Sequence, residues 1–261
     1  MKQIFLLLLL IAIIPACGSN IMSPFLSDPE ESLTEQIENA SSIDDFNSLI
    51  TEADKIIASD ASDEEKANAH LIKAEAILGK SEITPLDIMA KIATTVQEND
   101  NPLNLLDTAA PIEDLLAASY SLTEATRLGN SGSDDQQLLK GIVNTMIVVN
   151  TITTTFEIDE NGNSNLNSND SNINTYKNAV EEIMFPDNTN QTPSSNIFHY
   201  SQEAFNGFEN SNALTEEQKK ESEKISENIN KVEILYGKLD TKSETEVEDE
   251  IKQIFENFGN Q

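Results

Sequence analysis

The stretch GIVNTMIVVNTITTTF at residues 141–156 decides the fold of this chain. It carries no charged residue, and its aliphatic side chains fall on every side of a helix instead of one stripe. A helix that is apolar all round lies in the centre of a protein. Its β-branched residues also suit a pair of strands, so that alternative stays open. The short length, Asn144 and Asn150 argue against a membrane span. We predict a buried central helix from near Asp134 to Phe156.

Residues 43–57 show the pattern of a helix that packs one face against such a core. Their apolar residues recur at spacings of three and four, which places them on one side of a helix; they are Ile43, Phe46, Leu49, Ile50, Ala53, Ile56 and Ile57. A segment with small apolar residues follows at 67–78. We expect Gly79 to end that helix in a left-handed conformation.

Helix-start signals recur along the chain from residue 32. In each, a serine or threonine precedes by three positions an acid or amide that can reach back to free N–H groups. The pairs are Ser32 with Glu35, Ser42 with Asp45, Ser62 with Glu65, Ser133 with Gln136, Thr215 with Gln218 and Ser243 with Glu246. Pro85 and Pro111 add two starts, because proline at the first helical position loses no hydrogen bond. These agreeing signals predict an all-α fold.

Further helices are predicted at residues 84–96, 111–127 and 176–185. The aromatic residues between 197 and 208 are expected in the core. Two charged C-terminal helices are predicted at 215–239 and 244–258, within a C-terminal region of about 213–258, and each has a narrow apolar stripe. Those stripes either bind a partner helix or dock onto the body of the protein.

The sequence ANAHLIKAEAILGKSEITPLDIMAKIA at residues 67–93 resembles a degenerate tetratricopeptide (TPR) helical hairpin. Ala69, Ala74 and Ala76 stand near the small positions of its first helix, and Ala90 and Ala93 near those of the second. The resemblance extends over about residues 43–156. It implies stacked antiparallel helix pairs whose concave face binds a polypeptide or small ligand. An irregular helical bundle is the alternative.

The N-terminal sequence MKQIFLLLLLIAIIPACGSN has the layout of a secretory signal peptide, predicted at residues 1–16. Ile14-Pro15-Ala16-Cys17 resembles the lipobox of bacterial lipoproteins. The resemblance implies cleavage before Cys17, which would be lipidated, with palmitate among the acyl chains, and would hold the protein to a membrane. An ordinary signal peptide that happens to precede a cysteine is the alternative.

The remaining chain is divided into a short tether and one helical domain. Residues 17–31 contain glycine, serine and two prolines, which is typical of a flexible linker. Residues 32–261 form the predicted α-helical domain. Cys17 is the only cysteine, so no disulfide can form within one chain.

The charge balance narrows the range of partners. The net charge of −30 repels phosphate backbones, so we expect no binding to nucleic acid. It attracts basic partners and divalent cations, although acidity also simply keeps an exported protein soluble.

A polar stretch at about residues 157–174 interrupts the helical pattern. Asp159, Asn161, Asn163, Asn165 and Asp170 fall at positions 1, 3, 5, 7 and 12 of an EF-hand-like register, with Leu166 at the apolar position 8. These oxygen donors predict a weak calcium site, and a solvated low-complexity loop is the alternative. We expect no other cofactor.

No catalytic motif stands out in the sequence, and the two histidines, His70 and His199, lie in separate segments. We therefore expect a non-enzymatic binding or assembly scaffold of the bacterial cell envelope with a protein partner. A calcium-stabilised or small-solute-binding lipoprotein is the alternative. Gly18 replaces the aspartate that retains lipoproteins at the inner membrane of Gram-negative bacteria, so the outer membrane is favoured.

Overall fold

The structure is a computed structural model of the chain. It describes residues 33–82, 110–129, 132–157, 166, 175–184, 196–211, 227 and 230–259. Throughout these residues the regular elements are helices and no strand occurs, which confirms the all-α prediction. Residues 141–155 belong to one continuous helix, α7 (Asp134–Thr155), and Phe156 is its C-cap, so the two-strand alternative is wrong.

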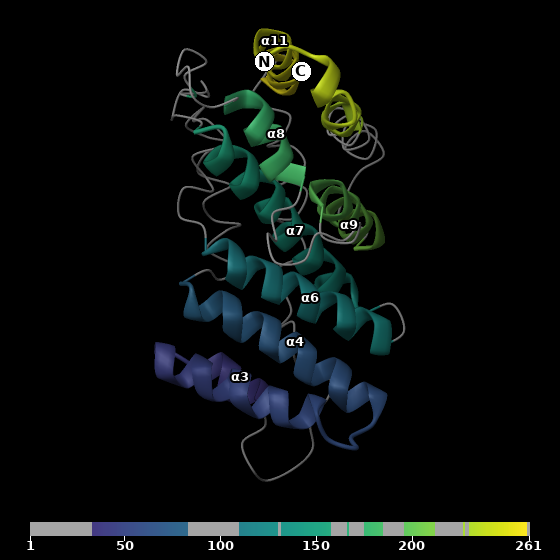
Figure 1. The fold of residues 1–261 in the computed structure, drawn as a ribbon. Helices are drawn as coiled ribbons and strands as arrows, with labels where there is room; N and C mark the ends of the chain where they lie inside the picture. Colours follow the sequence, from purple (N-terminus) through teal and green to yellow (C-terminus); the bar gives the residue numbers. More distant parts are fainter. Residues whose placement is uncertain are drawn as a thin grey trace.

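The helices form a stack that runs from α3 at one end to α11 at the other (Figure 1). In chain order they are α2 (Leu33–Asn39), α3 (Ile43–Ile57), α4 (Asp63–Lys80), α6 (Ile112–Leu128), α7, α8 (Thr175–Met184), α9 (Ile197–Asn210), the 3-10 turn η4 (Leu239–Thr241) and α11 (Glu244–Gly259). Residues 230–236 are also helical. α3 packs on α4, α4 on α6, α6 on α7, and α7 on α9. The predicted helix at 84–96 lies outside the described residues.

Capping boxes start four of these helices as predicted. In α3 the Ser42 hydroxyl accepts from the Asp45 amide at 3.2 Å, and the Asp45 carboxylate accepts from the Ser42 amide at 2.9 Å. The same reciprocal pairing is present at Ser62, Ser133 and Ser243. These bonds satisfy amides that have no partner within the helix. Ser32 and Thr215 lie outside the described residues.

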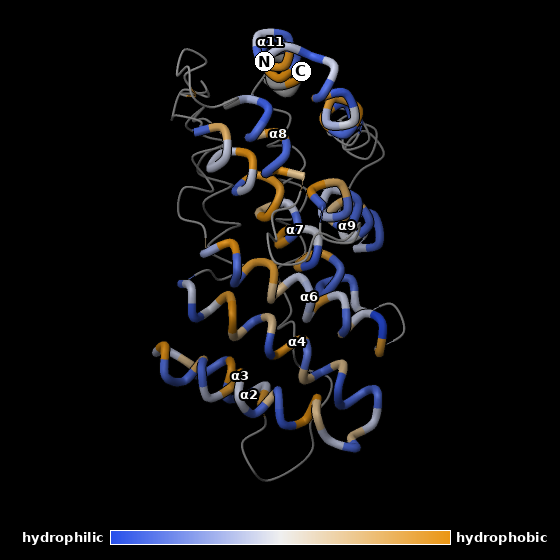
Figure 2. Tube along the Cα trace, in the orientation of Figure 1, coloured by the Kyte–Doolittle hydropathy of each residue, from blue (hydrophilic) through white to orange (hydrophobic). Residues whose placement is uncertain are grey.

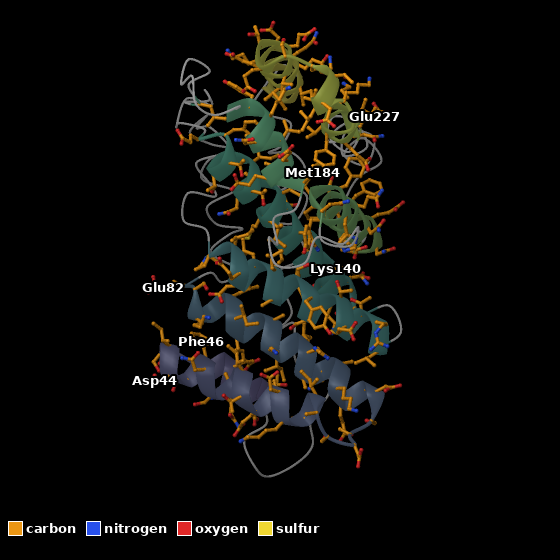
Figure 3. The ribbon with its side chains drawn as sticks, in the orientation of Figure 1. Asp44, Phe46, Glu82, Lys140, Met184 and Glu227 are labelled. Carbon is orange, nitrogen blue, oxygen red and sulfur yellow. The ribbon has the colours of Figure 1, made fainter. Side chains whose placement is uncertain are left out.

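The prediction for Gly79 is wrong. α4 continues to Lys80, and the left-handed residue after it is Glu82, with φ 57°. A Cβ on Gly79 would lie 2.5 Å from the ring of Phe46, which lies between α3 and α4 (Figure 3). The glycine therefore admits the aromatic ring at the α3–α4 contact. Ile43, at the start of the predicted apolar stripe, is 57% exposed, so the covered face of α3 begins one turn later, at Phe46.

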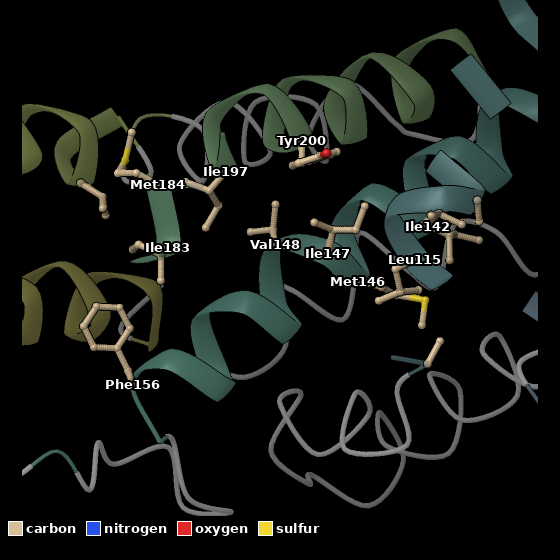
Figure 4. Packing of buried hydrophobic residues seen from close by; sticks show 14 of the residues in the cluster. Leu115, Ile142, Met146, Ile147, Val148, Phe156, Ile183, Met184, Ile197 and Tyr200 are labelled. Atoms are coloured by element: carbon tan, nitrogen blue, oxygen red, sulfur yellow. The ribbon is translucent and has the colours of Figure 1, made fainter. Parts of the chain in front are cut away.

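α7 is the central helix, as predicted. Val143, Asn144 and Ile147 are each 0% exposed, and hydrophobic residues recur along α4, α6 and α7 (Figure 2). The main apolar cluster joins α7 to α8 and α9, with Phe156, Ile183 and Tyr200 on facing sides (Figure 4). Leu166, from the polar stretch, also packs against this cluster. A smaller cluster around Leu49, Ile72 and Ala76 lies under α2.

Two glycines bring α7 and α9 unusually close together. A Cβ on Gly207 of α9 would lie 2.5 Å from the backbone nitrogen of Gly141 and 2.6 Å from the carbonyl oxygen of Gln137. A Cβ on Gly141 would meet the Phe208 ring at 2.9 Å. The crossing therefore requires residues without side chains at both positions.

The sequence did not reveal α9 as a helix. Its N-cap is Asn196, whose side chain accepts from the His199 amide at 2.7 Å. Asparagine at this position is a good cap, but the segment has few other helix-start signals. The core prediction for its aromatic residues is confirmed at Tyr200 and Phe208, which are 9% and 1% exposed.

The C-terminal segment docks onto the body of the protein. Its buried residues belong to the main cluster; they are Val232, Leu235, Leu239, Val247, Ile251 and Ile254. In these residues the apolar stripes therefore serve the core. The first C-terminal helix ends at residue 236, earlier than predicted, and Leu239 lies in η4. The Glu244 carboxylate accepts from the amides of Tyr176 and Lys177, which lie 68 and 67 residues earlier in the chain. Glu244 thereby caps the start of α8.

Candidate functional site

The residues predicted from the sequence as sites lie outside the described part of the structure. This holds for Cys17 and for the calcium candidates Asp159, Asn161, Asn163, Asn165 and Asp170. Where the structure does describe the chain, no three histidine, cysteine, aspartate or glutamate residues are placed to share a metal ion. Both the lipid anchor and the calcium site therefore remain predictions.

The two histidines are on different helices, which agrees with their placement in separate segments of the sequence. His70 is on α4 and His199 is on α9, with α6 and α7 packed between these helices in the stack. The structure thus brings no histidine pair together, and general-base chemistry would have to rest on either residue alone.

His70 lies at the seam between α4 and α6. It is 6% exposed, and its ring meets the ring of Tyr120 on α6 edge-on, with centroids 6.5 Å apart. Its Nδ1 atom is buried and has no hydrogen-bond partner among the described residues. Burial lowers the pKa of His70 below its ordinary value of 6.5, and the carboxylate of Glu124 opposes that change in part. The imidazole is therefore neutral at pH 7.

Two ion pairs flank this histidine. Lys73 pairs with Asp54 of α3 at 2.5 Å, and Arg127 pairs with Glu124 at 2.7 Å. Tyr120 is 66% exposed, the largest value among the big hydrophobic side chains that the structure describes. We call His70, Tyr120 and these two ion pairs the Tyr120 patch. It offers an aromatic ring and paired charges, which suit binding by contact better than bond-breaking chemistry.

A second polar group is buried inside the protein along α7. The Ser119 hydroxyl donates to Oδ1 of Asn144 at 2.7 Å, and Nδ2 of Asn144 donates to the Lys140 carbonyl at 2.8 Å. Lys140 itself, 7% exposed, forms an ion pair with Glu203 of α9. Figure 3 shows Lys140 within the stack. Each side chain named in this network has a partner within the network. The network therefore positions α6, α7 and α9 relative to one another and leaves none of these groups to bind a substrate.

Sequence reasoning missed this network, although one signal was present. Lys140 immediately precedes the uncharged stretch 141–156 and stands four positions before Asn144, on the same side of the helix. A charged residue on a helix that is otherwise buried needs a partner. The partner, Glu203, is in the segment whose helix was not predicted.

Glu75 of α4 is the most perturbed acid that the structure describes. It is half-buried beside the smaller apolar cluster, close to α2. Burial, with a smaller contribution from the carboxylate of Glu38, raises the pKa of Glu75 to about 7. This carboxyl group therefore changes its charge near neutral pH.

Comparison with protein-family models, with characterised proteins and with solved structures found no match. Among the described helices none is long and apolar enough to cross a membrane. The fold defines the protein as an all-α helical stack.

Proposed function

We propose that this chain is a lipid-anchored, non-enzymatic binding or assembly component of the bacterial cell envelope. The observation that carries the proposal is the sequence Ile14-Pro15-Ala16-Cys17 at the end of an uncharged apolar run. The apolar run is too short for a permanent span, and a cysteine at this position is where a lipoprotein receives its lipid. Gly18 favours the outer membrane as the destination.

The Tyr120 patch supports the binding part of the proposal. Exposed tyrosine and arginine side chains are typical of the central contacts in protein interfaces. In this patch each carboxylate is paired with a cation, although the net charge of the protein is −30. This face therefore repels an acidic partner less than an unpaired acidic surface does.

Metabolic labelling with a palmitate analogue, followed by membrane fractionation, tests the anchor. We expect label and membrane association in the full chain, and loss of both in Cys17→Ser. Ser19→Ala is the control, because it changes a hydroxyl close by and leaves the cysteine intact. An unlabelled wild type would overturn the lipid anchor.

Crosslinking in the native cell tests the binding part. We expect one protein to be crosslinked reproducibly, and Tyr120→Ala to reduce its yield at least severalfold while exposed Glu52→Ala does not. A wild type that is labelled with lipid but crosslinks to nothing would retain the anchor and overturn the scaffold proposal.

Calcium or small-solute binding is the second candidate, favoured by the EF-hand-like register from Asp159 to Asp170. With only two carboxylates in register, we expect a Kd on the order of 1 mM, in the range of extracellular modules. Calorimetry of wild type and Asp159→Asn would check it. No heat of binding at several millimolar calcium would remove this candidate.

A further inference from the structure

The first described helix of the chain lies at one end of the stack. α2 packs on α3 and α4, and Figure 2 shows it beside α3. α11 lies at the opposite end, next to α8 (Figure 1). Between these ends the chain packs from α3 through α4, α6 and α7 to α9, and packed helices lie about 8–10 Å apart. The two ends are therefore on the order of 35 Å apart.

The stretch between the proposed lipid anchor and α2 is short. Cleavage before Cys17 would make that residue the new N-terminus, and Leu33, the first residue of α2, follows it by 16 positions. A chain of this length spans at most about 55 Å when fully extended. As the flexible linker that the sequence predicts, it would span about 22 Å on average. That average is smaller than the depth of the stack.

The point of attachment decides which end of an anchored body lies nearer to the bilayer. The folded stack cannot enter the lipid, because its surface is polar and its net charge is −30. A tether fixed to one end of the stack therefore holds that end close to the bilayer, and the bilayer excludes the positions in which the other end would lie lower.

Neither end of the stack attracts anionic headgroups strongly enough to compete with the tether. The exposed charged residues of α2 and α3 are mostly acids; they are Glu35, Glu38, Asp44, Asp45, Glu52, Asp54 and Lys55. In α11, five acids precede the first lysine, Lys252; they are Glu244, Glu246, Glu248, Asp249 and Glu250. Both ends therefore repel an anionic surface within about 8 Å at physiological ionic strength.

We propose that the α2–α3 end of the stack faces the membrane and that the α8–α11 end projects away from it. The inference rests on the lipid anchor of the proposed function and adds the orientation of the anchored body. It also places the Tyr120 patch, which lies on α4 and α6, within one or two helix layers of the membrane-facing end. A partner of that patch then binds in the layer next to the membrane.

Energy transfer from a fluorophore on the protein to an acceptor dye on lipid headgroups tests this orientation. The full-length lipidated protein is inserted into preformed phosphatidylcholine vesicles with one exposed residue replaced, Glu52→Cys on α3 or Asp249→Cys on α11. Because Cys17 is the only natural cysteine and its thiol would carry lipid, a thiol-reactive fluorophore labels only the introduced residue. We expect transfer from position 52 to exceed that from position 249 at least severalfold.

The possible results separate the orientation from the anchor. Equal transfer from the two positions, or stronger transfer from position 249, would overturn the orientation and leave the anchor intact. No transfer from either position, together with no palmitate label on Cys17, would overturn the anchor and the orientation with it. Cys17→Ser, labelled only at position 52 or 249, is the control and should show no transfer.

A longer tether supplies an independent test. A second copy of residues 20–31, inserted after Glu31, leaves Cys17, Gly18 and α2 unchanged. We expect transfer from position 52 to fall and to approach that from position 249, because the attached end then lies farther from the bilayer. Unchanged transfer from position 52 would mean that a direct contact with lipid holds the body in place, and would overturn an orientation set by the tether.

Discussion

At the α7–α9 crossing two backbones come into direct contact, whereas α2 rests on α4 through a few apolar side chains. The crossing has Gly141 and Gly207 at its centre and a buried ion pair, Lys140–Glu203, beside it. The α2 contact consists of Leu33 and Ile37 packed on Leu49, Ile72 and Ala76 of α3 and α4. The comparison teaches that close fit and paired charge hold α9 to α7, whereas a small apolar contact holds α2 to the stack.

The sharpest test of the close fit is Gly207→Ala. Its added Cβ would overlap the backbone at Gly141 and Gln137, and backbone atoms cannot move aside without shifting a whole helix. We expect a loss of about 3 kcal/mol in the free energy of unfolding, measured by urea denaturation. Gly237→Ala is the control, because its nearest contacts at 3.7 and 3.8 Å are ordinary. A loss below about 1 kcal/mol would contradict a backbone contact at this crossing.

The buried charge pair gives the next largest effect. Lys140→Met leaves the Glu203 carboxylate without its partner, and we expect a loss of about 2–3 kcal/mol, since Glu203 retains some exposure. The double variant with Glu203→Met should recover most of it, because no charge then remains buried. Lys252→Met, in the more exposed pair with Glu248, should change stability by less than about 1 kcal/mol. If the double variant were as unstable as the single one, the Lys140–Glu203 pair would stabilise the fold by more than neutralising each other's charge.

These two positions also show what the sequence could and could not predict. The helices, the capping boxes and the central place of α7 could be predicted, because each follows from the spacing of apolar and capping residues within a single segment. The Gly141–Gly207 contact and the Lys140–Glu203 pair join segments more than sixty residues apart, and no local pattern encodes that pairing. The sequence around Glu75 resembles that of any acid on a helix surface, because its burial comes from tertiary packing. The candidate sites from sequence, Cys17 and the Asp159 to Asp170 register, stay predictions.

Gly79→Ala sharpens the comparison by placing a similar overlap at the other end of the stack. The obstacle here is the ring of Phe46, at 2.5 Å, and a half-buried side chain can rotate away more easily than a backbone can. Alanine also favours the helix by up to about 1 kcal/mol relative to glycine. We therefore expect a net change within about 1 kcal/mol in urea denaturation. A loss as large as that of Gly207→Ala would mean that the α3–α4 contact is as rigid as the crossing.

The smallest effect is expected at His70, whose response to pH is opposite in sign to that of Glu75. Burial lowers the pKa of His70 in the folded protein, so the unfolded chain binds the proton more readily. Its contribution to stability is present above the unfolded value of 6.5 and is lost as the pH falls below it. Urea denaturation between pH 5 and pH 7.5 should show less loss of stability with acid in His70→Gln than in wild type. Parallel curves would mean that the fold accommodates a charged imidazole at the α4–α6 seam.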